Sequence, residues 1–97
     1  MRVISQDGTI DIPYEMVAIQ RFQEKIYFLN KNLTGVEQLI DDIKLAEYST
    51  VEKAEKAMEM LREKYLDYIR ATNHETFYEF FDVPRVFRFP ADDEVKI

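Results

Sequence analysis

The side chains of this chain best suited to chemistry are its clustered carboxylates. They form two groups, Asp41 with Asp42, and Asp92, Asp93 and Glu94 in a row. Carboxylate oxygens are preferred ligands of Mg²⁺ and Ca²⁺, but an EF-hand loop needs alternating ligands and a glycine at its sixth position, which neither group has. A pair of glycosidase carboxylates meets only in the folded protein, so sequence spacing does not identify one. We therefore expect no metal or cofactor. The simplest interpretation is solvated acidic surface, and the functional alternative is a patch that binds a partner.

His74 is the only imidazole in the chain. A catalytic base needs an orienting partner and a pocket, whereas His74 lies in the polar run TNHE, at a predicted helix boundary. There is no glycine-rich phosphate loop, no nucleophile elbow and no cysteine. The pattern predicts that the protein is not an enzyme, and an enzyme that uses His74 is the minor alternative.

The charge balance indicates which kind of partner the protein can bind. The 97 residues, enough for one domain, contain 19 acidic and 13 basic side chains, giving a net charge of −6. Because nucleic-acid affinity rests largely on Lys and Arg, we expect no direct nucleic-acid contact. An acidic protein suits a partner with a basic groove instead. The chain has no signal-peptide core and no apolar run near the roughly 18 residues of a membrane span, which predicts a cytoplasmic protein without membrane contact.

Two β-hairpins are predicted in the first 30 residues. Residues 3–5 and 10–12 flank Asp7-Gly8, a strong turn signal, and the isoleucines of the second run alternate with polar residues. Residues 16–29 are rich in β-branched and aromatic side chains, which favours two more strands, with a turn at 23–25, over a competing helix.

A long amphipathic helix is predicted at about residues 50–71. Ser49-Thr50-Val51-Glu52 matches a capping box, and apolar side chains follow at spacings of three or four. The predicted apolar stripe comprises Val51, Ala54, Ala57, Met58, Leu61, Tyr65, Tyr68 and Ile69. A stripe of this width suits packing against a sheet. Alternating residues predict strands at 43–48, before the helix, and at 86–89, after it.

The segment between that helix and the last strand is dense in aromatic residues. Phe77, Tyr78, Phe80 and Phe81 are too many for one face of a short element. Core packing is the simplest interpretation, but an exposed aromatic patch would mark an interface, so a homo-oligomer formed through residues 77–81 is the alternative.

Three segments carry a resemblance to known proteins. They are residues 1–15 (MRVISQDGTIDIPYE), 46–62 (AEYSTVEKAEKAMEMLR) and 87–94 (FRFPADDE). Together they resemble small, mostly uncharacterised proteins carried by prophages and integrative elements of Gram-positive bacteria. The resemblance implies an accessory protein of a mobile element and supplies no catalytic residues. Such genes are a source of anti-CRISPR proteins, often small, acidic and non-enzymatic, some of which occupy the basic nucleic-acid channel of an RNA-guided nuclease.

The sequence thus predicts one α+β domain over residues 1–97. It has a small, mainly antiparallel sheet of four to six strands, one long helix on one face, and a solvated acidic tail from about residue 91. The predicted function is inhibition of a host protein, a CRISPR effector nuclease, through acidic surface. The alternative is a phage structural or assembly protein that self-associates. The predicted partner-binding residues are Glu37, Asp41, Asp42, Asp92, Asp93 and Glu94.

Overall fold

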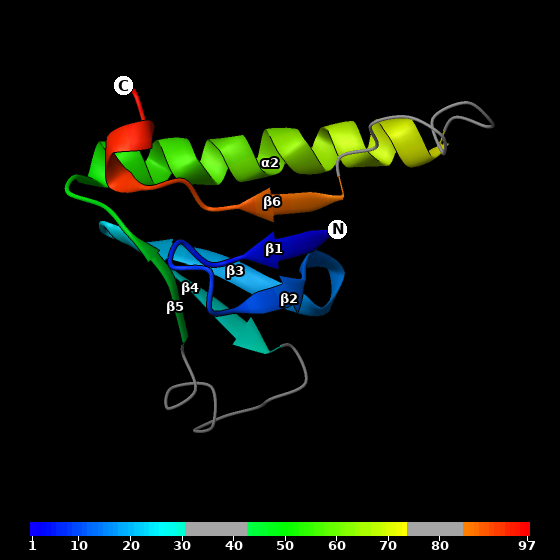
Figure 1. Ribbon diagram of the computed structural model, residues 1–97, viewed down its shortest axis with the longest axis horizontal. Coiled ribbons are helices and arrows are strands. Elements are labelled where there is room, and N and C mark those ends of the chain that lie inside the picture. Colours follow the sequence, from blue (N-terminus) through cyan, green and yellow to red (C-terminus); the bar gives the residue numbers. More distant parts are fainter. Residues whose placement is uncertain (31–42, 74–84) are drawn as a thin grey trace.

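The computed structural model describes residues 1–30, 43–73 and 85–97 (Figure 1). The elements in chain order are β1 (Arg2–Ile4), β2 (Asp11–Pro13), the 3-10 helix η1 (Tyr14–Met16), β3 (Val17–Phe22), β4 (Lys25–Asn30), β5 (Ile43–Glu47), α2 (Val51–Asn73), β6 (Val86–Arg88) and the 3-10 helix η3 (Asp92–Glu94). The predicted α+β class is confirmed. No helix within the described ranges is both long and apolar enough to cross a lipid bilayer.

The first sheet has the strand order β2-β1-β6. The predicted hairpin is confirmed, with Val3 opposite Ile12 in an antiparallel pair. The predicted last strand is also confirmed, and it pairs in parallel with β1, with Phe87 opposite Val3. Val3 therefore lies in the central strand and is fully buried, and the C-terminal part of the chain is tied to its N-terminal part.

The tight turn of the first hairpin depends on Asp7 and Gly8. Gly8 has a φ of 80°, which a side chain would strain, and a Cβ there would lie 3.2 Å from the Arg88 guanidinium. The Asp7 carboxylate accepts hydrogen bonds from the Ser5 hydroxyl, the Thr9 N–H and the Thr9 hydroxyl. These bonds, the one from Ser5 foremost, lower the pKa of Asp7 to about 2.

The second sheet has the order β3-β4-β5, and both of its strand pairs are antiparallel. The predicted second hairpin is confirmed, and its turn is the two residues Gln23 and Glu24, with Gln23 at a φ of 55°. The prediction of one sheet is wrong, because β2 and β3 do not pair. The Tyr14 N–H donates to the Met1 carbonyl at the end of the β1–β2 ladder, and the η1 turn then redirects the chain before β3 begins.

Helix α2 runs along the longest dimension of the molecule, with the strands on one side of it, and it contacts β3 and β4 (Figure 1). Its buried residues Ala54, Ala57 and Leu61 belong to the predicted stripe, whereas Val51 is exposed. The predicted capping box is wrong by one residue. Thr50 is the cap, and its hydroxyl accepts the Lys53 N–H at 3.1 Å, so Glu52 is not in the position that completes the box.

One core joins both sheets and the helix. Its buried apolar residues are Met1, Val3, Ile26, Leu45, Ala46, Tyr48, Ala54, Ala57, Leu61, Phe87, Phe89 and Val95. Since they come from strands of both sheets, from α2 and from the C-terminal segment, the described elements form a single packed unit.

Candidate functional site

The acidic turn at Asp92–Glu94 lies against the first turns of α2 (Figure 1). The Glu94 carboxylate accepts the Ala91 N–H at 2.8 Å, which closes the turn. The next residue, Val95, is 2% exposed and belongs to the core. The prediction of a solvated tail is therefore wrong for Asp92 and Val95, which hold the segment on the helix, whereas Ala91, Asp93 and Glu94 are exposed.

Asp92 is bound within the protein through both of its carboxylate oxygens. One oxygen accepts the Ser49 N–H at 2.6 Å, and the other lies 3.1 Å from the Lys53 ammonium. Lys53 also donates to the Asp92 carbonyl at 3.0 Å. The Ser49 N–H, and after it Lys53, hold the pKa of Asp92 below its ordinary value. Asp92 thus joins the C-terminal segment to the start of α2, and its charge is compensated locally.

Asp93 and Glu94 are the members of this cluster that face solvent. Asp93 is exposed and has no hydrogen-bond or ion-pair partner among the residues that the structure describes, while Glu94 uses one oxygen for the Ala91 N–H. The other predicted binding residues, Glu37, Asp41 and Asp42, lie outside the described residues. His74 and the aromatic segment 77–81 lie outside them as well, so self-association through that segment stays a prediction.

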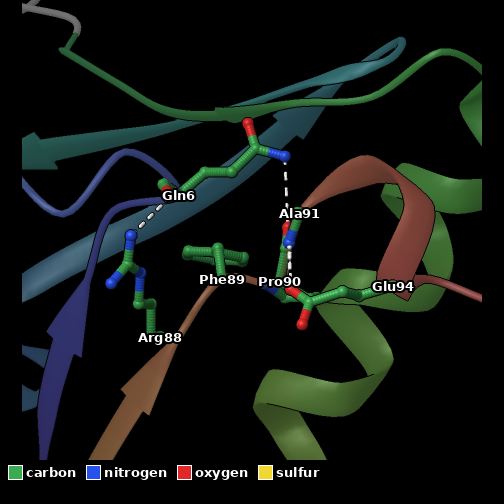
Figure 2. A pocket seen from close by; sticks show the side chains of 6 residues that line it. All are labelled: Gln6, Arg88, Phe89, Pro90, Ala91 and Glu94. Carbon is green, nitrogen blue, oxygen red and sulfur yellow. Dashed lines mark hydrogen bonds between the residues drawn. The ribbon is translucent and has the colours of Figure 1, made fainter.

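A hollow of about 400 Å³ lies beside the acidic turn (Figure 2). Its lining residues are Gln6, Arg88, Phe89, Pro90, Ala91 and Glu94. The Arg88 guanidinium donates to the Gln6 carbonyl at 3.2 Å, and the Gln6 amide donates to the Pro90 carbonyl at 3.1 Å. With a guanidinium and a carboxylate on its walls, the hollow suits a polar contact with a partner. None of the six lining side chains is a hydroxyl, thiol or imidazole that could serve as a nucleophile.

Gln6 connects three segments that are distant in sequence. Its backbone N–H donates to the Leu45 carbonyl at 2.8 Å, and its side-chain oxygen accepts the Glu47 N–H at 3.0 Å. The Pro90 carbonyl accepts both the Gln6 amide and the Tyr48 hydroxyl, the latter at 2.8 Å. Burial, and then the charges of the acidic turn, raise the pKa of the Tyr48 hydroxyl. In sequence Gln6 is an ordinary turn residue, and no local pattern marks this role.

A second hollow, of about 420 Å³, lies at the other end of the strands. Its lining residues are Tyr14, Glu15, Val17, Ala18, Ile19 and Tyr65. Both Glu15 oxygens accept hydrogen bonds from the Met1 ammonium, at 2.8 and 3.0 Å, and this contact lowers the pKa of Glu15. The Tyr14 and Tyr65 rings lie 4.4 Å apart. Because the Glu15 carboxylate is already paired with the Met1 ammonium, the two aromatic rings are the groups of this hollow that suit a cationic side chain.

The described residues contain no group of three or more His, Cys, Asp or Glu side chains arranged to hold a metal ion. Their charge is nearly balanced. Residues 31–42 and 74–84 together contain six acids and one base, so these two segments carry five of the six excess negative charges of the chain.

No known protein family, curated protein or solved structure matches this chain. The resemblance to proteins of prophages and integrative elements therefore stays an expectation.

Proposed function

We propose that the protein acts without catalysis, by binding a basic surface of a host protein through carboxylates. The observation that carries this proposal is the acidic turn held on α2. Because Asp92 and Val95 fix the turn, Asp93 and the free oxygen of Glu94 are presented with little loss of conformational entropy on binding. The excess negative charge of the chain supports the same kind of partner.

The resemblance described above suggests the class of host protein. An RNA-guided nuclease holds its nucleic acids in a channel lined with positive charge, and an acidic protein of this size would compete for such a channel. On this proposal Glu37, Asp41, Asp42, Asp93 and Glu94 contact the partner. Asp92 contributes indirectly, since both of its oxygens are bound within the protein.

The test compares two variants that remove equal charge from different surfaces. The first is Glu37→Gln, Asp41→Asn, Asp42→Asn, Asp93→Asn, which leaves Asp92 and Glu94 in place because they hold the turn. The matched control is Glu52→Gln, Glu59→Gln, Glu63→Gln, Asp67→Asn, on the exposed side of α2. Both sets remove four carboxylates, so a nonspecific effect of net charge would affect them equally.

The measurement is cleavage of target DNA by a guide-loaded RNA-guided nuclease of a Gram-positive host. We expect the concentration for half inhibition to rise about tenfold or more in the first set and to change less than about threefold in the control. Equal inhibition by the unmodified protein and the first set would reject the acidic surface as the binding site. Absence of inhibition by the unmodified protein would reject the nuclease as the partner.

A further inference from the structure

The outer side of β3 is an exposed strand edge. In the second sheet β3 is paired only with β4, and no other described residue bonds to its backbone. Phe22 and Lys25 close a two-residue turn and so form a hydrogen-bonded pair. Along an antiparallel ladder such pairs alternate with pairs that are not hydrogen-bonded to each other, whose backbone groups point outward. The N–H and C=O groups of Val17, Ile19 and Arg21 therefore point away from β4, available to another strand.

This edge lacks the usual protection against strand pairing. It is six residues long, contains no proline or bulge among its described pairs, and has a single charged residue, Arg21. The Arg21 guanidinium donates to the Gln23 carbonyl at 2.9 Å and lies 3.8 Å from the Glu55 carboxylate, a contact too long to hold it firmly. Apolar side chains are exposed at both ends of the strand, with Phe22 at 65% and Met16 at 56%.

We propose that β3 pairs antiparallel with β3 of a second copy of this chain, about a two-fold axis at Ile19. This register uses the outward backbone groups, since it places Ile19 opposite Ile19 and Val17 opposite Arg21. On the face away from α2 it places Ala18 opposite Gln20, both exposed. The product is a continuous sheet with three strands from each copy and both α2 helices on the same face. The inference is independent of the proposed function.

The side chains at the ends of the strand favour a second copy over an unrelated strand. The same register brings the exposed Phe22 of each copy beside the exposed Met16 of the other, which buries two apolar surfaces and allows sulfur–aromatic contacts. Arg21 of the second copy faces Val17, at the rim of the hollow that contains Glu15 and the Tyr65 ring. Both Glu15 oxygens are bound by the Met1 ammonium, so the group offered to the guanidinium is the Tyr65 ring, over which a guanidinium can stack. Because the two-fold axis repeats each contact, every one of these favourable contacts occurs twice in the dimer.

The first test measures the molar mass by sedimentation equilibrium from about 5 to about 500 µM, a range suited to a small interface. We expect a reversible dimer whose fraction rises with concentration. A monomer throughout this range would overturn the proposal. A monomer that instead bound an extended peptide of another protein along β3 would also overturn the assignment to a second copy.

The second test uses a charge exchange at the facing positions 18 and 20. In Ala18→Lys, Gln20→Lys, two like-charged pairs face each other across the axis, and we expect the dimer dissociation constant to rise about tenfold. In Ala18→Glu, Gln20→Lys, the same positions form two opposite-charge pairs, and dimerisation should be retained or strengthened. Both positions are exposed in the single chain, so both variants should keep the far-ultraviolet circular dichroism of the unmodified protein.

The register itself is tested by disulfide formation, which is easy to interpret because the chain has no cysteine. Ala18→Cys, Gln20→Cys should form a covalent dimer on mild oxidation, whereas each single Cys variant should not, because the proposed register brings position 18 near position 20 only. A dimer that showed equal dissociation constants for both charge variants and no such crosslink would use another surface and would overturn the proposal.

Discussion

The two outer edges of the second sheet differ in how they are protected. At the β5 edge, the Gln6 backbone donates to Leu45 and its side chain accepts the Glu47 N–H, so the turn between β1 and β2 covers the strand. At the β3 edge, no described residue performs this role. We call the first the closed edge, with Gln6 and Tyr48 beside it and Phe89 in the hollow that Gln6 lines, and the second the open edge. Both belong to one antiparallel sheet, so the difference arises from contacts between distant segments.

The closed edge shows how few groups are needed to protect a strand. One glutamine side chain bonds both β5 and the C-terminal segment, and the buried Tyr48 hydroxyl donates to the same Pro90 carbonyl. The strand at the open edge pairs with β4 without a register shift, but among the described residues it has no such partner, and exposed apolar side chains lie at its ends. We therefore expect substitutions at the closed edge to change folding stability, and substitutions at the open edge to change association instead.

The largest expected difference comes from two phenylalanines. Phe89 is 1% exposed, its ring lies 5.1 Å from that of Phe87, and its N–H donates to the Ile4 carbonyl. Phe89→Ala leaves a cavity in the core and should lower the free energy of unfolding by about 4 kcal/mol. Phe22→Ala, on the open edge, should lower it by less than about 0.5 kcal/mol because Phe22 is already exposed.

Urea denaturation at low protein concentration measures both values without a contribution from association. Similar losses in the two variants would contradict the distinction between the edges.

A smaller difference is expected for two glutamines. Gln6→Ala removes the side-chain bonds to the Glu47 N–H and the Pro90 carbonyl and should lower the free energy of unfolding by about 2 kcal/mol. The Pro90 carbonyl keeps its bond from Tyr48, which limits the loss. Gln20→Ala, on the open edge, should change the free energy of unfolding by less than about 0.5 kcal/mol.

Hydrogen exchange of the Glu47 amide provides the local measurement. It should accelerate in Gln6→Ala and stay unchanged in Gln20→Ala, since only the first variant uncovers this N–H. If the Glu47 amide exchanged at the same rate in both variants, Gln6 would not be what closes the edge.

Most of the secondary structure could be predicted from the sequence because it depends on local periodicity. Alternation at Ile10 and Ile12 and apolar spacing from Ala54 to Leu61 are set by strand and helix geometry. The division into two sheets could not be predicted, because it depends on the direction in which η1 turns the chain after Pro13. The parallel pairing of β6 with β1 joins residues more than eighty positions apart, and no local pattern specifies such a contact.

The candidate site was predicted less well, for a related reason. The clustering of Asp92, Asp93 and Glu94 is visible in the sequence, but their roles depend on which atoms lie nearby after folding. Lys53 and the Ser49 N–H lie about forty residues away, and they make Asp92 a structural residue while Asp93 stays exposed. The spacing of Asp92 and Val95, with an acidic turn followed by an apolar residue, is the one local sign that this segment packs on the protein.

The smallest expected effect distinguishes these adjacent aspartates and depends on pH. Asp92→Asn weakens the contacts with Ser49 and Lys53 and should lower the melting temperature at pH 7 by about 4 °C. Asp93→Asn should leave it within about 1 °C, because Asp93 has no partner within the described parts of the chain. Differential scanning calorimetry of the two variants and the unmodified protein measures both shifts.

The pH dependence identifies the cause. Since folding lowers the pKa of Asp92, its ionised form stabilises the folded state above the ordinary carboxyl pKa of 3.8, and this stabilisation is lost as the pH falls through the lower pKa of the folded state. The difference in melting temperature between the unmodified protein and Asp92→Asn should therefore be full at pH 7 and shrink below about pH 4. A difference that stayed constant down to pH 2 would mean that Asp92 acts through packing or hydrogen bonds that survive protonation, and not through its charge beside Lys53.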